Sequence, residues 1–177
     1  MTQSPSAAAS ATTHAVPTAL FVAAIAAAAI LGAFYFEYFM KLAPCPLCLE
    51  QRIPYYVGIP LALVVAFAAW RKAPAPLVGV GFATLAIVFL IGVGLGVYHA
   101  GIEWKFWPGP TECSGPLGQL GGGGGLLEKM QTTAVVRCDE AAWRLFGISL
   151  AGYNVLISLF LAGESVAGAR RLFARDS

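Results

Sequence analysis

Two cysteines separated by two residues, Cys45 and Cys48, have the types and spacing most suited to chemistry in this chain. Two sulfurs at this spacing can close and open a small disulfide ring, or they can hold a metal ion. Apolar stretches lie on both sides of the pair, which places it at the edge of a membrane. A small lipid-soluble electron carrier, a quinone above all, is therefore a candidate electron acceptor for this pair.

The other two cysteines, Cys113 and Cys138, lie in one long polar segment. Residues 121–125 between them are five consecutive glycines, which form a flexible tether. A bridge between the two would close a long, mobile loop that a soluble protein can reach. After the glycines, apolar residues at helical spacing predict a short helix lying in the membrane interface: Leu126, Leu127 and Met130.

The composition indicates a protein dissolved in lipid. The chain has 177 residues, of which 58% are hydrophobic and 11% charged, whereas about 25% are charged in an ordinary soluble protein. Its mean hydropathy is +0.73. A soluble fold of this length cannot bury so much apolar surface. The net charge of +2, without a basic arm or stripe, argues against a nucleic-acid partner.

Four apolar spans set the fold class, at about residues 16–36, 53–70, 76–98 and 145–162. Each is long enough to cross a bilayer as a helix, and none alternates as a barrel strand does. The sequence therefore predicts an all-α, integral membrane four-helix bundle over residues 16–165. Residues 1–15 are expected to form a disordered tail and residues 166–177 a basic tail.

The basic residues orient the bundle. Arg71 and Lys72 follow the second span, and the C-terminal tail holds Arg170, Arg171 and Arg175. By the positive-inside rule both segments are cytoplasmic, and an even number of spans puts the N-terminus there as well. All four cysteines then lie on the outer side, in an oxidising compartment where disulfides persist. In a bacterium this compartment is the periplasm.

Two further residues are candidates for a cofactor site. Arg52 lies four residues after Cys48, one turn deeper on the same face if a helix begins near Cys48. A cation there can stabilise a thiolate and the negative charge of a reduced quinone. Pro54 costs this helix a hydrogen bond unless the helix begins later. His99 lies at the outer end of the third span, where an ordinary interfacial histidine is an equally good interpretation.

Several motifs, taken together in their order along the chain, resemble one family: Cys45-Pro46-Leu47-Cys48 with Gln51-Arg52, Tyr98-His99-Ala100-Gly101 with Glu103-Trp104, Cys113, Val136-Arg137-Cys138-Asp139, and Phe146-Gly147-Ile148-Ser149-Leu150-Ala151-Gly152-Tyr153-Asn154. This is the disulfide bond formation protein B (DsbB) family, which the chain resembles over about residues 17–165. The run of glycines is a departure from the family pattern.

The resemblance implies a quinone-dependent thiol oxidase of the bacterial inner membrane. Such a protein reoxidises a periplasmic DsbA-like dithiol protein and passes the electrons to ubiquinone or menaquinone. By resemblance, Cys113 meets the partner, Cys138 attacks Cys45, and Cys48 faces the quinone. Arg52 then polarises the quinone, and His99 is its second neighbour.

Other interpretations remain open from the sequence. The cysteines could be structural staples of a non-enzymatic membrane protein, or they could form a zinc site, although no metal is expected because Cys113 and Cys138 lack tight spacing. An epoxide-reductase-like quinone reductase is a further alternative, but there the loop cysteines precede the C-x-x-C pair. Glu37 and Glu103 are expected to be solvated, and the Gly92-x-x-x-Gly96 spacing predicts a helix-packing face.

Overall fold

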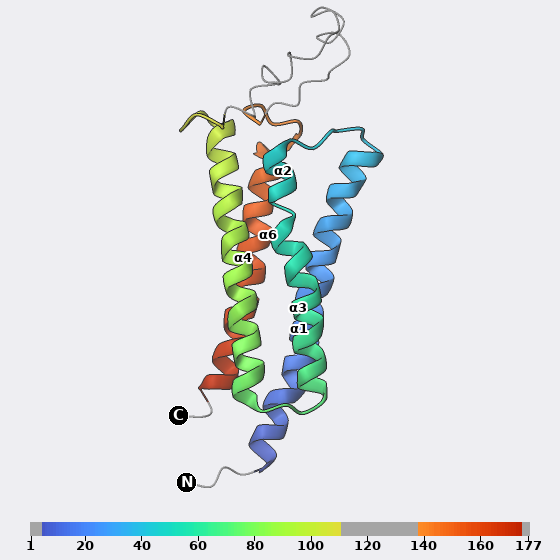
Figure 1. The fold of residues 1–177 in the computed structure, drawn as a ribbon, viewed down its shortest axis with the longest axis vertical. Helices are drawn as coiled ribbons and strands as arrows, with labels where there is room; N and C mark the ends of the chain where they lie inside the picture. The colour runs from blue at the N-terminus through green and yellow to red at the C-terminus, as the bar shows by residue number, and fades with distance from the viewer. Residues whose placement is uncertain (1–4, 111–137, 175–177) are drawn as a thin grey trace, which may run out of the picture.

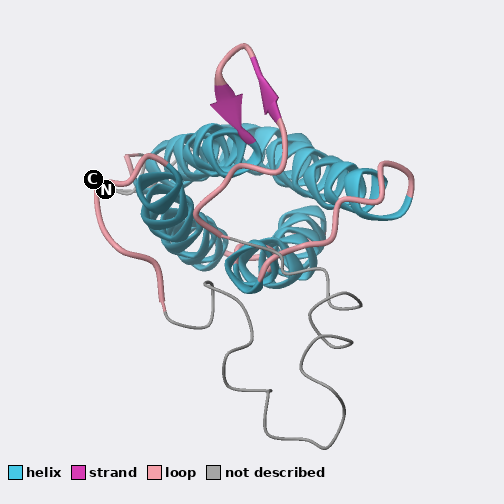
Figure 2. Ribbon diagram, turned by 90° about the horizontal axis from the view of Figure 1, so that it is seen from above, coloured by secondary structure: helices cyan, strands magenta, loops and turns pink. Residues whose placement is uncertain are grey.

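Four long helices lie side by side and form the molecule, with both termini at one end (Figure 1). The computed structural model describes residues 5–110 and 138–174. A short helix and a two-stranded hairpin lie at the end away from the termini, and the hairpin projects from the bundle (Figure 2). In chain order the elements are α1 (Pro5–Tyr38), α2 (Pro46–Glu50), α3 (Ile53–Trp70), α4 (Ala75–Glu103), β1 (Arg144–Leu145), β2 (Ile148–Ser149) and α6 (Leu150–Phe173).

The predicted four-helix membrane bundle is confirmed. Four segments are long and apolar enough to cross a membrane: His14–Tyr38, Pro46–Trp70, Ala75–Glu103 and Leu150–Phe173. Their outward faces expose large apolar side chains, as at Leu31, Val64 and Leu77. Lipid contact is the arrangement that makes such exposure favourable.

Small residues let α4 and α6 approach closely, and this is the most extensive helix pair in the bundle. A methyl group added at Gly96 would lie 2.7 Å from Cγ2 of Val155, and one at Gly92 would lie 3.0 Å from Oγ of Ser158. Gly94, between them, has open space around it. The packing face predicted from the Gly92-x-x-x-Gly96 spacing is thus confirmed.

A break separates α2 from α3, and Pro54 causes it. Proline has no N–H to donate to the carbonyl of Glu50, so a continuous helix cannot pass this point without losing a hydrogen bond. The helix instead ends at Glu50 and restarts at Ile53, where Pro54 occupies the first turn and needs no intrahelical partner. Helix α3 thus begins at residue 53, where the sequence predicted the second span to begin, although the segment long and apolar enough to cross a membrane starts at Pro46. Arg52 caps α3 and does not continue the helix that holds Cys48.

The N-terminal tail and the end of the third span differ from the sequence prediction. The disordered tail expected over residues 1–15 is helical from Pro5, because proline starts this helix and an alanine-rich run continues it. Helix α4 continues to Glu103, five residues past the predicted end. His99 is consequently part of a helix and not of the outer loop.

The fourth span is displaced. Residues 145–149 were expected to be helical but contribute to a hairpin, because Phe146 and Gly147 both have positive φ. Helix α6 begins only after Ser149, whose side chain accepts from the N–H of Gly152. It then runs to Phe173, so most of the predicted basic tail is helical. The predicted interfacial helix and the five glycines lie outside the described residues.

The glycine face of α4 gives a direct test of this packing. Replacing Gly96 by Leu should lower stability by about 1–3 kcal/mol, because the added side chain meets Val155 and Asn154 across the helix contact. Gly94→Leu is the matched control, since it changes helix composition equally but enters open space. Thermal unfolding in detergent measures both variants. Equal losses in the two would contradict the packing described here.

Candidate redox site

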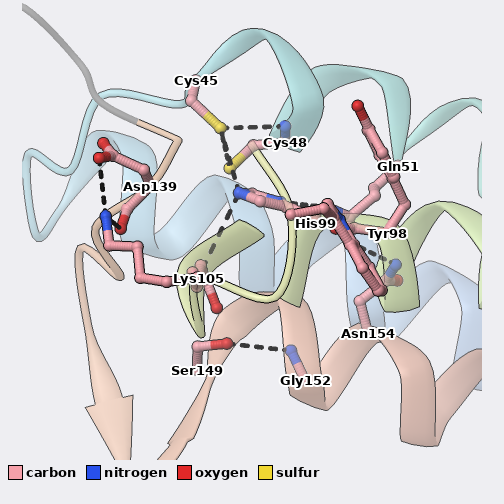
Figure 3. Close-up of polar contacts among 12 residues, drawn as sticks. Cys45, Cys48, Gln51, Tyr98, His99, Lys105, Asp139, Ser149, Gly152 and Asn154 are labelled. Atoms are coloured by element: carbon pink, nitrogen blue, oxygen red, sulfur yellow. Dashed lines mark hydrogen bonds and ion pairs between the residues drawn. The ribbon is translucent and has the colours of Figure 1, made fainter. Parts of the chain in front are cut away.

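Cys45 and Cys48 lie at the start of α2, with their sulfurs 2.8 Å apart (Figure 3). Cys45 is the N-cap of this helix, and its Sγ accepts from the backbone N–H of Cys48 at 3.2 Å. Pro46 at the first helical position fixes the backbone for that turn. Cys45 is buried, while Cys48 is partly exposed. The local fold therefore holds the two thiols within reach of one another.

The surroundings of Cys45, which precedes the second span, favour its thiolate. Its sulfur lies 2.8 Å from that of Cys48 and accepts from the backbone N–H of Cys48, and Nε2 of His99 lies 3.7 Å away. The hydrogen bond from Cys48 is the largest cause, and contacts with His99 add to it, so together they outweigh burial and lower the pKa of Cys45 to about 5. A thiol with a lowered pKa is both a nucleophile near neutral pH and a good leaving group.

Cys138, which is distant in the sequence, packs against Cys45. It is disulfide-bonded and packs in one buried cluster with Cys45, Leu47 and Ile102, at 1% exposure. Lys105, just after α4, fixes this segment by donating to the backbone oxygen of Asp139 at 2.9 Å and to its carboxylate at 2.8 Å (Figure 3). The structure thus brings three of the four predicted cysteines together. The fourth, Cys113, lies outside the described residues.

A mostly apolar cavity of about 530 Å³ lies on the other side of the cysteine pair. Cys48 lines it and Cys45 does not. The remaining wall comes from α1, the loop between α1 and α2, the break between α2 and α3, α3, the hairpin with the segment before it, and α6, with Gln51, Arg52 and Trp143 among the lining residues. Its volume and apolar lining with a few polar groups are typical of small-molecule sites.

Arg52 is held in place at this cavity by two contacts from α1. Its Nη1 donates to Oε2 of Glu37 at 2.7 Å, and its guanidinium lies 5.4 Å from the ring centre of Phe34. The Arg52 side chain is only 11% exposed. Glu37 was expected to be solvated, but it pairs with this arginine because α1 ends beside the start of α3. Arg52 and Cys48 therefore line one cavity, although they belong to two separate helices and not to one helical face as the sequence predicted.

His99 lies on the other face of the cysteine pair. It is 3% exposed, its Nε2 points at Cys45, and it is not among the residues that line the cavity. Its neighbour one turn on, Glu103, was expected to be solvated but is buried, with Oε1 at 3.9 Å from the same nitrogen. The prediction failed because α4 extends further than its apolar run and carries Glu103 into the bundle.

Sequence reasoning missed a group of polar side chains around His99. Gln51 contacts Nδ1 of His99, Asn154 donates to Gln51, and Tyr55 donates to Asn154. Three helical segments supply these residues, so no spacing within one segment relates them. The available signal was the presence of amide side chains in or beside apolar spans, where a buried polar group needs a partner.

Cys45, Cys48 and His99 also form a set of metal-ligand types, with ligand atoms within 4.8 Å of one another. Thiolate and imidazole are ligands that soft metal ions prefer. The described residues supply three such ligands, one fewer than the four of a closed structural zinc site, and two of them are thiols in contact with each other. The group therefore fits thiol chemistry better than metal binding.

Comparison with known proteins places this site in a family. The family model described as disulfide bond formation protein DsbB matches residues 16–167. A disulfide bond formation protein B of Xanthomonas oryzae is 28% identical over 142 residues, covering 78% of this chain and 81% of that protein. A disulfide bond formation protein B 2 of Pseudomonas savastanoi is 32% identical, covering 80% and 81% respectively. No solved structure matches the chain significantly.

The environment of Cys45 predicts a thiolate in the reduced protein. Because its pKa is lowered to about 5, the thiolate should persist from neutral pH down to that value and be lost below it. An acid titration of the ultraviolet thiolate absorbance measures this directly. Cys45→Ser should abolish the signal. A thiolate that forms only in the alkaline range of an ordinary thiol would contradict the described contacts.

Proposed function

The chain belongs to the disulfide bond formation protein DsbB family, and on that premise we propose that it oxidises a periplasmic, thioredoxin-like dithiol protein of the DsbA kind and passes the electrons to a membrane quinone. Family membership makes it a thiol oxidoreductase of the membrane. The proposal adds the protein partner, the quinone and the direction of electron flow.

One observation carries the proposal: the Cys45–Cys48 pair has two different sides. Cys45 packs against Cys138, which belongs to the segment that follows the long outer loop. Cys48 lines an apolar cavity that also holds Arg52. A pair placed in this way can take electrons from a protein on one side and give them to a small apolar molecule on the other.

Thiol exchange supplies the first half of the reaction. The partner's thiolate attacks the Cys113–Cys138 bridge at Cys113, and Cys138 is released. Cys138 then attacks the Cys45–Cys48 bridge at Cys45 and releases Cys48. The second thiol of the partner displaces Cys113, and the Cys113 thiolate displaces Cys45 from Cys138. The partner leaves oxidised and Cys45 and Cys48 are left reduced; each new disulfide replaces one that breaks, so no outside oxidant is needed. The burial of Cys138 against Cys45 supports this transfer, because exchange requires direct contact between sulfurs.

The cavity supplies the second half. A ubiquinone or menaquinone held there would supply the oxidising equivalent, an acceptor for two electrons and two protons, with which Cys45 and Cys48 close their disulfide again. Cys48 is the cysteine that faces it, and the apolar walls exclude water. The Arg52 guanidinium, fixed by Glu37 and Phe34, presents a positive charge to oxygens that become negative on reduction.

The proposal includes an orientation in the bacterial inner membrane. The turn between α3 and α4, which holds Arg71 and Lys72, lies at the same end of the bundle as the last turn of α6, which holds Arg170 and Arg171 (Figure 1). Helix α2, with Cys45 and Cys48 at its start, lies at the opposite end. The positive-inside rule then supports cytoplasmic termini and a periplasmic redox site.

Arg52→Met tests the quinone half. Loss of a charge-assisted hydrogen bond in an apolar site should cost roughly 1.5–3 kcal/mol, or on the order of 10- to 100-fold in quinone kinetics. Thiol exchange with the partner should change far less, because Arg52 lies at the cavity and not at Cys138. Quinone absorbance, followed with purified protein, a short-chain quinone and a reduced thioredoxin-like partner, gives the first rate. A quinone-free single turnover gives the second.

Two further variants complete this experiment. Arg71→Met is the matched control, since Arg71 also lies over a phenylalanine ring but at the other end of α3. Arg52→Lys should rescue only in part, because it keeps the charge and loses the planar fork. If Arg52→Met slows both assays equally, or neither, the quinone site lies elsewhere.

Cys138→Ala tests the partner half and the orientation together. Without the resolving thiol, a disulfide-linked complex with the partner should accumulate through Cys113. Reduced partner protein is added outside intact spheroplasts that contain the variant, and non-reducing gels detect the complex. Cys113→Ser in the same background should remove it. A complex that survives this change contradicts the assigned cysteines, and one that needs opened membranes contradicts the orientation.

A further inference from the structure

A chain of hydrogen bonds runs through the bundle and ends at Cys45 (Figure 3). The Tyr55 hydroxyl donates to Oδ1 of Asn154 at 2.6 Å, and Nδ2 of Asn154 donates to Oε1 of Gln51 at 2.6 Å. Nε2 of Gln51 contacts Nδ1 of His99, and Nε2 of His99 lies 3.7 Å from Sγ of Cys45. The chain links α3, α6, the α2–α3 break and α4. Each amide group in it uses its oxygen on one side and its nitrogen on the other.

The direction of this chain decides which nitrogen of His99 carries a proton. The oxygen of Gln51 is occupied by Asn154, so Gln51 presents its N–H to His99. Nδ1 must then be the acceptor, and the proton of a neutral imidazole lies on Nε2. Ser158 lies 2.9 Å from the Tyr55 hydroxyl and can donate to it, which leaves the Tyr55 hydrogen for Asn154.

We propose that His99 is a catalytic hydrogen-bond donor to the Cys45 sulfur, held in its Nε2–H form by Gln51, Asn154 and Tyr55 as positioning residues. This rests on the proposed function, and it assigns His99 to the thiol-exchange side of the reaction. His99 contacts a reacting sulfur, whereas the cavity on the Cys48 side does not include it. A neutral donor suits this buried place, because it stabilises a negative sulfur without burying a second charge.

The donor acts when Cys45 is expelled from a bond to Cys138. An attacking thiolate forms a new disulfide with Cys138, the Cys45–Cys138 bond breaks, and its electron pair stays on Cys45. The departing sulfur becomes a thiolate that the N–H groups of His99 and Cys48 already face. Exchange is faster when the leaving thiolate is more stable. Charge and electrons balance, since one thiolate replaces another.

The charged and titratable groups around Cys45 are few among the described residues. Cys48 faces it from α2, His99 and Glu103 lie on α4, and the disulfide-bonded Cys138 packs from the segment before the hairpin. An ion pair between His99 and Glu103 is the competing explanation for how His99 would stabilise the Cys45 thiolate. Its carboxylate lies 3.9 Å from Nε2 of His99 and could instead hold a charged imidazolium there. A charged imidazole would carry protons on both nitrogens, which the hydrogen bond from Gln51 to Nδ1 opposes.

Nitrogen NMR of the imidazole tests the proposal on the full-length reduced protein. The chain has two histidines. His14 lies in the N-terminal part of α1, so His14→Gln leaves His99 as the single histidine that carries the nitrogen label. A purification tag without histidine is required. The spectrum should show a protonated Nε2 and a bare Nδ1. A protonated Nδ1, alone or together with Nε2, overturns the proposal.

Two substitutions then test the positioning residues. Gln51→Leu should mix the two neutral forms of His99 and move the midpoint of Cys45 alkylation upward by about one pH unit, or tenfold less thiolate at pH values below both midpoints. Tyr55→Phe, a milder change, should shift both readouts in the same direction. Tyr56→Phe is its matched control, because Tyr56 is exposed to the surroundings of the bundle. Unchanged spectra and midpoints in Gln51→Leu and Tyr55→Phe overturn the positioning role.

Glu103→Gln separates the donor chain from the ion pair. Under the proposal, this variant keeps the Nε2–H form and does not raise the alkylation midpoint. A rise as large as that of Gln51→Leu would show that charge holds the thiolate, and it overturns the proposal. Neither readout needs a quinone or a protein partner. A failure of quinone reduction with the predicted spectrum therefore contradicts the proposed function alone, and the reverse result contradicts this inference alone.

Discussion

Lipid offers no hydrogen-bond partners, so polar side chains between these helices must satisfy one another. Hydrogen bonds between such side chains connect the helices in the half of the bundle that holds the cysteines. Gln51, Tyr55, His99 and Asn154 come from separate segments, and each is satisfied only when the helices take these relative positions. Tyr55 and His99 are each 3% exposed, so an unpaired group at either place would carry a large desolvation cost. The hydrogen bonds thus fix the register in which the cysteines, the arginine and the cavity meet.

The cysteine pair gains its two sides from the break between α2 and α3. If the helix ran on without interruption, Cys48 and Arg52 would lie on one face by helical repeat alone. Pro54 prevents this, and Arg52 reaches the cavity as the cap of a new helix, braced by Glu37 and Phe34 on α1. Cys45 is left at the cap of α2, where backbone N–H, thiol and imidazole converge on its sulfur. One missing N–H therefore separates the face of the pair that packs against Cys138 from the face that lines the cavity.

The segment after the outer loop depends on a different kind of contact. Cys138 is placed by apolar burial against Cys45, Leu47 and Ile102, and by the exposed pair between Lys105 and Asp139. The ion pair alone is worth little in water, since Lys105 is 62% exposed. Burial of Cys138 is the stronger effect. Burial of this kind packs Cys138 against Cys45 without a covalent link between them.

The sequence alone determined the class of the molecule and the chemistry of its cysteines. Long apolar runs without alternation can satisfy their backbones in lipid only as helices, so four spans followed from composition and length. The C-x-x-C spacing and Arg52 indicated a redox pair beside a cation, because these are local relations that the chain carries in any fold. The helix ends were less well determined: α4 extends to Glu103 and α6 begins at Leu150, where capping and positive-φ residues override the limits of the apolar run.

Only the tertiary structure decided which polar groups meet. Gln51 and Asn154 are 103 residues apart, and nothing in either neighbourhood relates them before the helices pack. The same holds for Glu37 with Arg52, and for His99, whose position at the outer end of a span fitted a quinone neighbour and a plain interfacial residue equally well. Its contact with Cys45 depends on the rotation of α4 about its own axis. That rotation is set by the close approach of Gly92 and Gly96 to α6, a long-range packing relation that no local pattern encodes.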